Sequence, residues 1–158
     1  MLSEYQKIIK QMNDAFEEFG VLIANETKKI DQFDLTMQQD LILAYIAKHL
    51  NVTANEIAHS FGITKSAVSQ VLSKLEQNKM IVRAVNPQNK RESFISLGEN
   101  GEKYVSLLQE LDIKLIKNYY SKVNLDDLTH MTRTMEKINE VIKEENETTQ
   151  KKGTLHRE

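Results

Sequence analysis

Six polar residues recur at steps of one and three positions, the spacing that gathers side chains on one side of a helix. They are Lys65, Ser66, Ser69, Gln70, Ser73 and Lys74. Short hydroxyl and amide side chains can hydrogen-bond to phosphates and to base edges. The two lysines would add electrostatic attraction without the bulk that holds a helix away from a groove. We therefore expect these residues to contact duplex DNA, the alternative being an ordinary solvated helix face.

A second basic pair, Lys90 and Arg91, lies in the polar segment NPQNKRE at residues 86–92. This segment separates two runs rich in β-branched and apolar residues, 80–85 and 93–97, so the sequence predicts a β-hairpin with a long polar tip. A hairpin directly behind a recognition helix is the wing of a winged helix. Since a guanidinium suits the narrow minor groove and its phosphates, we expect the tip to contact DNA. The alternative is a solvated loop.

The segment that must position the six polar residues runs from Ala54 to Ser73 and has the pattern of a DNA-binding helix-turn-helix. Two helices that cross steeply need a small residue where they approach and a residue that tolerates positive φ in the turn. Ala58 and Gly62 meet these two needs. The apolar residues expected on the facing sides are Ile57, Phe61, Ile63, Val68 and Val71.

Capping residues support the same two helices. Thr53 and Glu56 have the spacing of a capping box, which predicts a helix start near Ala54. Thr64 follows the turn as the expected N-cap of the second helix, and we include it in the DNA-facing set. The expected buried stripe of this second helix consists of Ala67, Val68, Val71, Leu72 and Leu75.

The remaining sequence is mostly helical in its periodicity. Helices are expected over residues 3–30, from the Thr36 cap to about residue 50, over 99–123, and from the Asn124 cap to about residue 143. In the second of these we expect four buried residues, Leu41, Ile42, Tyr45 and Ile46. The charged, polar segment 147–158 is expected to be a disordered tail. The predicted fold is mainly α with a small β-hairpin wing.

The first helix and the last two carry more apolar surface than a small winged helix can cover, which indicates a twofold dimer. We therefore expect residues 1–33 and 98–146 to form a helical dimerisation region, and residues 34–97 to form the DNA-binding lobe. A twofold axis would place two recognition helices roughly 34 Å apart, the separation of successive major grooves on one side of the duplex.

Composition limits the alternatives. The 158 residues are 40% hydrophobic, include no cysteine, and show neither a signal peptide nor an apolar run of membrane-spanning length. We expect a cytoplasmic protein without disulfides and without a membrane partner. Although the net charge is −2, residues 34–97 carry seven Lys/Arg against five Asp/Glu, or +2. The basic charge is therefore concentrated in the expected DNA-binding lobe.

Catalytic and metal-binding patterns are absent from the sequence. The four histidines, His49, His59, His130 and His156, lie in separate segments without a paired spacing, so we expect no metal site and no cofactor. An enzyme would need a phosphate loop or a nucleophile motif, and we find neither. Besides an enzyme, the main alternative to a DNA-binding regulator is a winged-helix protein-interaction or dimerisation module without ligand response.

The helix-turn-helix at 54–73 and the wing at 86–97 resemble those of the MarR family of bacterial transcription regulators. The resemblance extends from about Ser3 to Lys143. It includes Gly101, which lies where the family has the glycine of a Leu-Thr-x-x-Gly motif. The family's wing motif is Asp-Pro-x-Asp-x-Arg. Pro87 and Arg91 match it, whereas asparagines replace its two aspartates, which removes a carboxylate that would orient the arginine.

The resemblance implies a homodimer built from the first and the last two helices that binds palindromic promoter sites, commonly as a repressor. It also implies release by a small aromatic or phenolic effector bound between the lobes. The residues that we expect to line such a pocket, if they are not simply core, are Phe16, Phe19, Tyr45, Tyr104 and Leu108.

Overall fold

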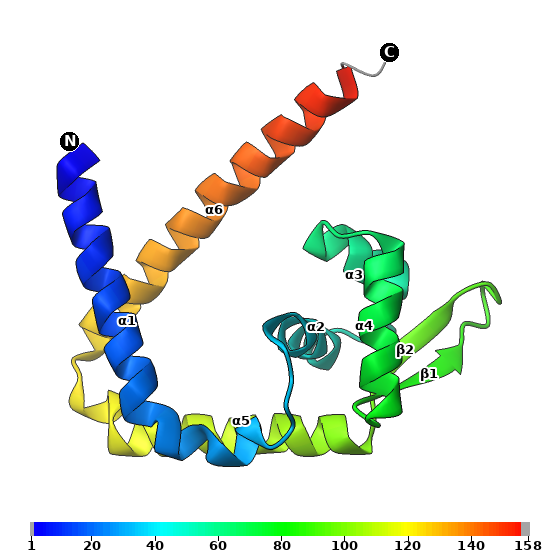
Figure 1. The fold of residues 1–158 in the computed structure, drawn as a ribbon, viewed down its shortest axis with the longest axis horizontal. Helices are drawn as coiled ribbons and strands as arrows, with labels where there is room; N and C mark the ends of the chain where they lie inside the picture. The colour runs from blue at the N-terminus through cyan, green and yellow to red at the C-terminus, as the bar shows by residue number, and fades with distance from the viewer. Residues whose placement is uncertain (1, 156–158) are drawn as a thin grey trace. The chain divides into compact units, whose positions relative to one another are not determined.

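The structure is a computed structural model, and it describes residues 2–155, with side chains for residues 2–146 and 148. The chain divides into two compact units at Asp112, and each is described by itself. In chain order the elements are α1 (Leu2–Asp31), α2 (Met37–Lys48), α3 (Ala54–Phe61), α4 (Lys65–Gln77), β1 (Ile81–Val85), β2 (Ser93–Leu97), α5 (Glu99–Asn118), a 3₁₀ turn η1 (Tyr120–Lys122) and α6 (Leu125–Leu155) (Figure 1).

One hydrophobic core joins α2, α3, α4, the hairpin and the start of α5. Every element from α2 to β2 contributes at least one fully buried side chain, and α5 contributes Tyr104. The buried residues are Ile42, Leu43, Ile46, Val52, Ile57, Ala58, Val68, Val71, Leu72, Leu75, Met80, Ile81, Ile95 and Tyr104. The predicted stripe of α4 is confirmed, with Ala67 at its half-buried edge.

The buried face of α2 includes Ile42 and Ile46 as expected, but Tyr45 is only half-buried and Leu41 is exposed. Leu41 is 52% exposed, whereas Leu43, which we did not include, is fully buried. The buried residues of α2 are Gln39, Ile42, Leu43 and Ile46, a stripe with the steps of three and four that one helix face requires. Leu41 lies about 200° around the helix from Leu43 and therefore faces away from the core.

Both predicted capping boxes are present. Thr36 Oγ1 accepts from the Gln39 amide at 3.3 Å, and Gln39 Oε1 accepts from the Thr36 amide at 2.8 Å. Thr53 and Glu56 repeat this arrangement at the start of α3. Each box satisfies two backbone donors that would otherwise lack partners, so α2 and α3 begin where the sequence predicted.

The hairpin is a two-stranded antiparallel sheet that is also bound to the helix-turn-helix. Ile81 pairs with Leu97, and Arg83 pairs with Ile95. The Ile95 amide donates to the Val52 carbonyl at 2.7 Å, which forms an isolated antiparallel β-bridge just before α3. The wing and the entry to α3 therefore share one backbone network.

The start of α5 packs closely on the loop between α4 and β1. The Gly98 amide donates to the Met80 carbonyl at 2.8 Å, and the Asn100 amide donates to the Lys79 carbonyl at 3.1 Å. A Cβ atom at Gly101 would lie 2.0 Å from the Met80 carbonyl oxygen. This contact explains the glycine that the sequence carries here, because any side chain would push α5 away from the loop.

The bounds of α1 agree with the sequence prediction, whereas those of α5 and α6 differ from it. Helix α1 is continuous from Leu2 to Asp31, as predicted, and none of its residues is buried. Helix α5 ends at Asn118 and is followed by the 3₁₀ turn, although we expected it to reach Val123. Helix α6 continues to Leu155, past Lys143, into the segment for which we expected disorder.

The composition of residues 144–155 accounts for the longer α6, because the segment contains several Glu, Gln and Lys residues, which favour helix, and no proline. The last part of the predicted tail, residues 156–158, lies outside the described residues. Within the described part of the chain, no helix is both long enough and apolar enough to cross a bilayer.

Candidate nucleic-acid interface

The turn between α3 and α4 has the geometry that a helix-turn-helix requires. Gly62 is in the left-handed region with φ of +61°, and its amide donates to the carbonyl of His59 at 3.3 Å. The Ile63 amide donates to the Ala58 carbonyl at 3.1 Å. Ala58 is buried where the two helices meet, so the small residue and the glycine lie where the sequence predicted.

We call the six polar residues of α4 the α4 face. All six, Lys65, Ser66, Ser69, Gln70, Ser73 and Lys74, are exposed, while Val68, Val71, Leu72 and Leu75 of the same helix are buried. Thr64, the residue before them, is also exposed, and its Oγ1 accepts from the Ala67 amide at 3.1 Å. The Thr64 oxygen therefore caps α4, which leaves its hydroxyl proton for a contact outside the protein.

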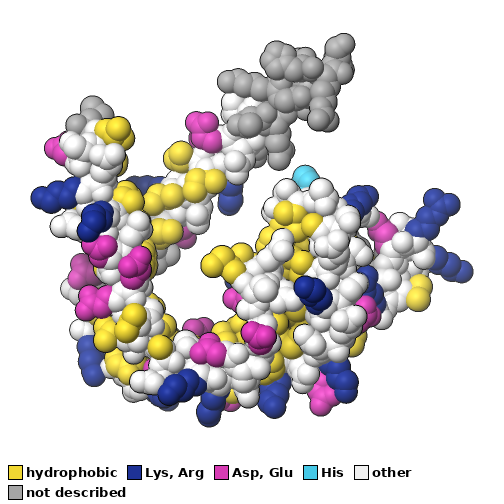
Figure 2. Space-filling model, viewed as in Figure 1, with side chains coloured by type: hydrophobic (Ala, Val, Ile, Leu, Met, Phe, Trp, Pro, Cys, Tyr) yellow, Lys and Arg dark blue, Asp and Glu magenta, His cyan; other side chains and the backbone are white. Residues whose placement is uncertain are grey.

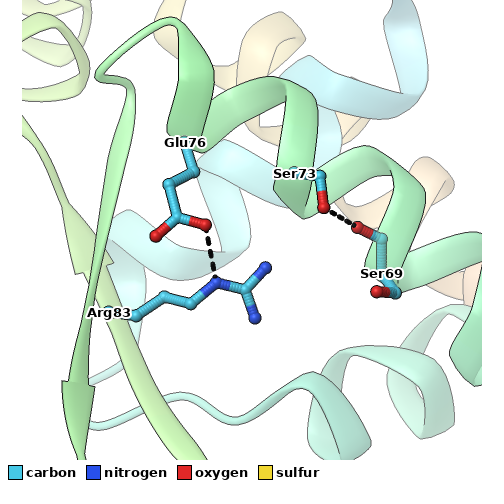
Figure 3. Close-up of polar contacts among 4 residues, drawn as sticks. All are labelled: Ser69, Ser73, Glu76 and Arg83. Atoms are coloured by element: carbon cyan, nitrogen blue, oxygen red, sulfur yellow. Dashed lines mark hydrogen bonds and ion pairs between the residues drawn. The ribbon is translucent and has the colours of Figure 1, made fainter.

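Two serines of the α4 face differ in what they can offer a ligand. The Ser73 hydroxyl donates to the Ser69 carbonyl at 2.8 Å (Figure 3). In this arrangement Ser73 has only acceptor lone pairs left, and a phosphate, which also only accepts, is not a partner for it. The Ser69 hydroxyl makes no hydrogen bond within the described residues. Ser69 can therefore serve as either donor or acceptor, whereas Ser73 must first break its bond to the helix.

Four cations of the candidate interface are unpaired among the residues that the structure describes. In the described part of the chain no ion pair or side-chain hydrogen bond involves Lys65, Lys74, Lys90 or Arg91. Arg83 on β1 differs, because its Nε donates to Glu76 Oε2 of α4 at 2.9 Å (Figure 3). Unpaired cations can neutralise phosphates without first breaking an internal contact.

The wing tip is held by the two asparagines that replace the aspartates of the family motif. Asn86 is buried, and its Oδ1 accepts from the amides of Gln88 at 3.0 Å and Asn89 at 3.3 Å. Asn89 Oδ1 accepts from the backbone amide of Arg91 at 3.2 Å. Asparagine oxygens thus form the turn bonds that a carboxylate would form. In the space-filling view, Lys and Arg side chains project from the wing tip (Figure 2).

Sequence reasoning missed two contacts between the hairpin and the helix-turn-helix, the Arg83–Glu76 pair described above and a second one at the wing loop. Asn55 Nδ2, in the first turn of α3, donates to Glu92 Oε1 at the end of the wing loop. The two residues are 37 positions apart and are both partly buried. Neither belongs to a periodic stripe or a local cap pair, so the sequence alone gave no signal for this bond.

The five residues expected in an effector pocket have different environments. Phe16 and Phe19 are exposed on α1, and Leu108 is half-buried against the core. Tyr45 packs within the helix-turn-helix lobe: its ring stacks on His49 with centroids 4.1 Å apart and meets Phe61 edge-on at 5.7 Å. The Tyr45 hydroxyl accepts from Ser60 at 3.1 Å. These contacts of Tyr45 are those of a packing residue.

Tyr104 is the most deeply buried of the five. Its hydroxyl donates to Asp40 Oδ1 at 2.7 Å, and its ring meets Phe33 edge-on with centroids 5.2 Å apart. Burial, together with the hydrogen bond to the Asp40 carboxylate, raises the pKa of the Tyr104 phenol well above its usual value near 10. The phenol is therefore neutral at physiological pH and serves as a hydrogen-bond donor.

Of the five, Tyr104 lines a cavity of about 470 Å³. The other lining residues come from the end of α1, the connector and the start of α2: Ile30, Asp31, Asp34, Leu35, Met37 and Asp40. A smaller cavity of about 230 Å³ lies beside the α4 face and includes Gln70 and Lys74. Among the described residues, no group of three or more His, Cys, Asp or Glu side chains is arranged to hold a metal ion.

Comparison with known proteins agrees with this arrangement. A family profile described as MarR family matches residues 33–92. The HTH-type transcriptional regulator YvnA of Bacillus subtilis, itself named uncharacterized, is 30% identical over 102 residues, 63% of this chain and 65% of that protein. The match thus spans slightly less than two thirds of YvnA. The HTH-type transcriptional regulator TcaR of Staphylococcus aureus is 24% identical over 147 residues, 90% of this chain and 96% of TcaR.

Two solved structures with DNA have the same fold. The S. aureus MepR–DNA complex superimposes with a TM-score of 0.60 and 27% identity, covering 77% of this chain and 98% of MepR. Streptococcus pneumoniae FabT in complex with DNA superimposes with a TM-score of 0.71 and 17% identity, covering 89% of this chain and 98% of FabT. The superpositions show the same fold over most of the chain, and the profile match shows that residues 33–92, which hold the helix-turn-helix, the first wing strand and the wing loop, belong to the MarR family of winged-helix transcription regulators.

Proposed function

We propose that this protein is a cytoplasmic transcription regulator that binds near-palindromic promoter DNA as a homodimer and acts as a repressor. The α4 face enters the major groove, where Ser69 and Gln70 contact base edges and the lysines contact phosphates. The wing tip places Arg91 at the adjacent minor groove. Thr64, Ser66, Ser73 and Lys90 complete the proposed contact set.

The observation that carries this proposal is the group of unpaired cations beside an exposed polar helix face. Lys65, Lys74, Lys90 and Arg91 have no partner among the described side chains, while the opposite side of α4 is fully packed in the core. An exposed polar face alone would fit any solvated helix. Four free cations on the same helix and on the following hairpin favour a polyanion. MepR and FabT, two relatives in fold, have each been solved bound to DNA.

The apolar surfaces of the terminal helices support the homodimer. On α1, Tyr5, Ile8 and Leu22 are exposed, and on α6 so are Ile138 and Ile142. Solvated monomers rarely leave such stripes uncovered, and a second copy of the chain offers the same stripes in return. Two linked lobes would also gain affinity, since the second half-site is bound intramolecularly.

We further propose that a small aromatic effector relieves DNA binding, with the 470 Å³ cavity beside Tyr104 as the place to look for it. Asp31, Asp34 and Asp40 line this cavity, and the Asp40 carboxylate already accepts from the Tyr104 hydroxyl. These carboxylates would repel the negative charge of a phenolate. We therefore expect the effector that binds in this cavity to be a neutral or cationic aromatic compound. Phe16, Phe19, Tyr45 and Leu108 stay predictions for this role.

The proposal is tested by selecting bound fragments from the genomic DNA of the source organism and measuring their affinity as a function of salt. The selected sites should be near-palindromes with half-sites about 10 base pairs apart, occupied by a dimer. The logarithm of the affinity should fall with the logarithm of salt concentration with a slope of several units. Binding that is insensitive to salt, or no enrichment of any sequence, would favour the protein-interaction module instead.

A further inference from the structure

Among the described residues, two side-chain hydrogen bonds join the hairpin to the helix-turn-helix, in addition to the shared hydrophobic core. The first joins Arg83 in the middle of β1 to Glu76 near the end of α4. The second joins Glu92, at the end of the wing loop, to Asn55 in the first turn of α3. Only the second is next to Arg91, the residue proposed to enter the minor groove. Of the two, the Asn55 contact is therefore the one placed to orient the wing tip.

Glu92 is also the residue whose backbone closes the wing. Its amide donates to the Asn89 carbonyl at 2.9 Å, and its carbonyl accepts from the Asn86 amide at 3.3 Å. Because Asn55 binds the side chain of the same residue, α3 fixes the base of the loop that carries Arg91. Asn55 is itself fixed, since it lies inside the capping box formed by Thr53 and Glu56.

The contact also determines where a negative charge lies. Glu92 adjoins Arg91 in the sequence, and a free Glu92 carboxylate would be available to pair with that guanidinium. Such a pair would compete with the phosphates of DNA for Arg91. While Asn55 donates to the carboxylate, Glu92 has a partner in α3, and Arg91 has none among the described residues.

We infer that Asn55 is a positioning residue for DNA binding: by donating to Glu92 it holds the wing so that Arg91 reaches the minor groove. The inference rests on the proposed function, because it assigns a role within the same interface. A wing that is already in place loses less conformational freedom on binding than a mobile one. Asn55 thus contributes to affinity through Arg91, without needing to touch DNA.

The first experiment is a double-mutant cycle on operator affinity, measured by fluorescence anisotropy with full-length protein. Asn55→Ala should weaken binding about three- to tenfold, in the range expected for one hydrogen bond. Adding Asn55→Ala to Arg91→Ala should weaken binding no further than Arg91→Ala alone. Independent, additive losses would overturn the inference, since Asn55 would then act by a route other than Arg91.

A charge-balanced exchange provides the second experiment and guards against a variant that simply misfolds. Asn55→Asp alone places two carboxylates together and should weaken binding more than Asn55→Ala. Combining Asn55→Asp with Glu92→Gln restores a hydrogen bond in the reverse direction and the original net charge, so affinity should return to within about twofold of wild type. Failure of this exchange to restore affinity in a folded dimer would overturn the positioning role.

The proposed DNA contact of Arg91 and the proposed positioning role of Asn55 can be refuted separately. If Arg91→Ala leaves operator affinity unchanged, the proposed wing contact is wrong. If Arg91→Ala weakens binding but Asn55→Ala does not, the wing contact stands and the positioning role of Asn55 is wrong. Thermal unfolding of every variant, followed by circular dichroism, establishes that the affinities compare folded proteins.

Discussion

Replacing Arg91 with alanine provides the most direct test of the wing as a DNA contact. The side chain is exposed and makes no hydrogen bond or ion pair among the described residues. Its removal should therefore change the free energy of unfolding by no more than about 0.5 kcal/mol, the usual range for a surface substitution. Only the Arg91 backbone amide, which donates to Asn89, participates in the turn, and alanine keeps that amide.

The expected loss of binding is larger. One guanidinium contact with DNA is worth about 1 to 3 kcal/mol, so each half-site should lose about 5- to 150-fold in affinity. A dimer presents two wings, and the loss for the whole operator should approach twice this free energy where the two sites act independently. If each arginine also neutralises one phosphate, the salt slope should fall by about two units.

The assay is fluorescence anisotropy with a labelled operator, repeated over a series of salt concentrations. Lys103→Ala is the matched control, because it also removes one exposed positive charge per chain, from α5 instead of the wing. Arg91→Ala should weaken binding and flatten the salt dependence, whereas Lys103→Ala should leave both near wild type. Equal effects of the two substitutions would show that bulk charge, and not the wing, determines affinity.

Four other substitutions test the remaining assignments. Gln70→Ala should change which base pairs are preferred, whereas Lys74→Ala should weaken binding equally on all sequences; a uniform loss for both, measured on a panel of operator variants, would reduce Gln70 to a phosphate contact. Tyr104→Phe removes the donor to Asp40 and should cost about 1 kcal/mol of unfolding free energy at neutral pH. Because burial raises the pKa of the folded Tyr104 phenol, its contribution is fully present below the unfolded pKa of about 10 and is lost as pH rises beyond it. Urea unfolding should therefore show a steeper alkaline loss in wild type than in Tyr104→Phe, and equal slopes would contradict the buried neutral phenol. Ile138→Glu should lower the dimer fraction in sedimentation; an unchanged dimer would exclude this part of α6 from the interface.

Local patterns in the sequence predicted most of the DNA-binding lobe. The capping boxes at Thr36 and Thr53, the left-handed Gly62 and the buried stripe of α4 depend on residues within one or two helical turns of each other. Such short-range relations can be recognised without knowing the fold. The error at Leu41 arose because its apolar side chain was counted as part of the buried stripe of α2, although it points away from that stripe.

The interactions that sequence reasoning missed join residues far apart in the chain or depend on a single rotamer. Asn55 and Glu92 are 37 positions apart, and Tyr104 reaches Asp40 across 64. Their side chains meet only once β2 and α5 have packed on the helix-turn-helix. The Ser73 hydroxyl bond to its own helix is local, yet serine at this position could equally have pointed its proton outward.

The pairing of charges explains how a chain with a net charge of −2 can present a DNA-binding surface. Residues 34–97 contain five carboxylates, and four of them accept hydrogen bonds from protein donors: Asp40, Glu56, Glu76 and Glu92. Three of these four donors are uncharged, so only the Glu76 contact uses a cation, Arg83. The lobe thus engages most of its negative charge with hydroxyl and amide groups, and this leaves Lys65, Lys74, Lys90 and Arg91 for phosphates. The net charge of the lobe is only modestly positive, but the positive charges at the interface have no internal partners in the described structure.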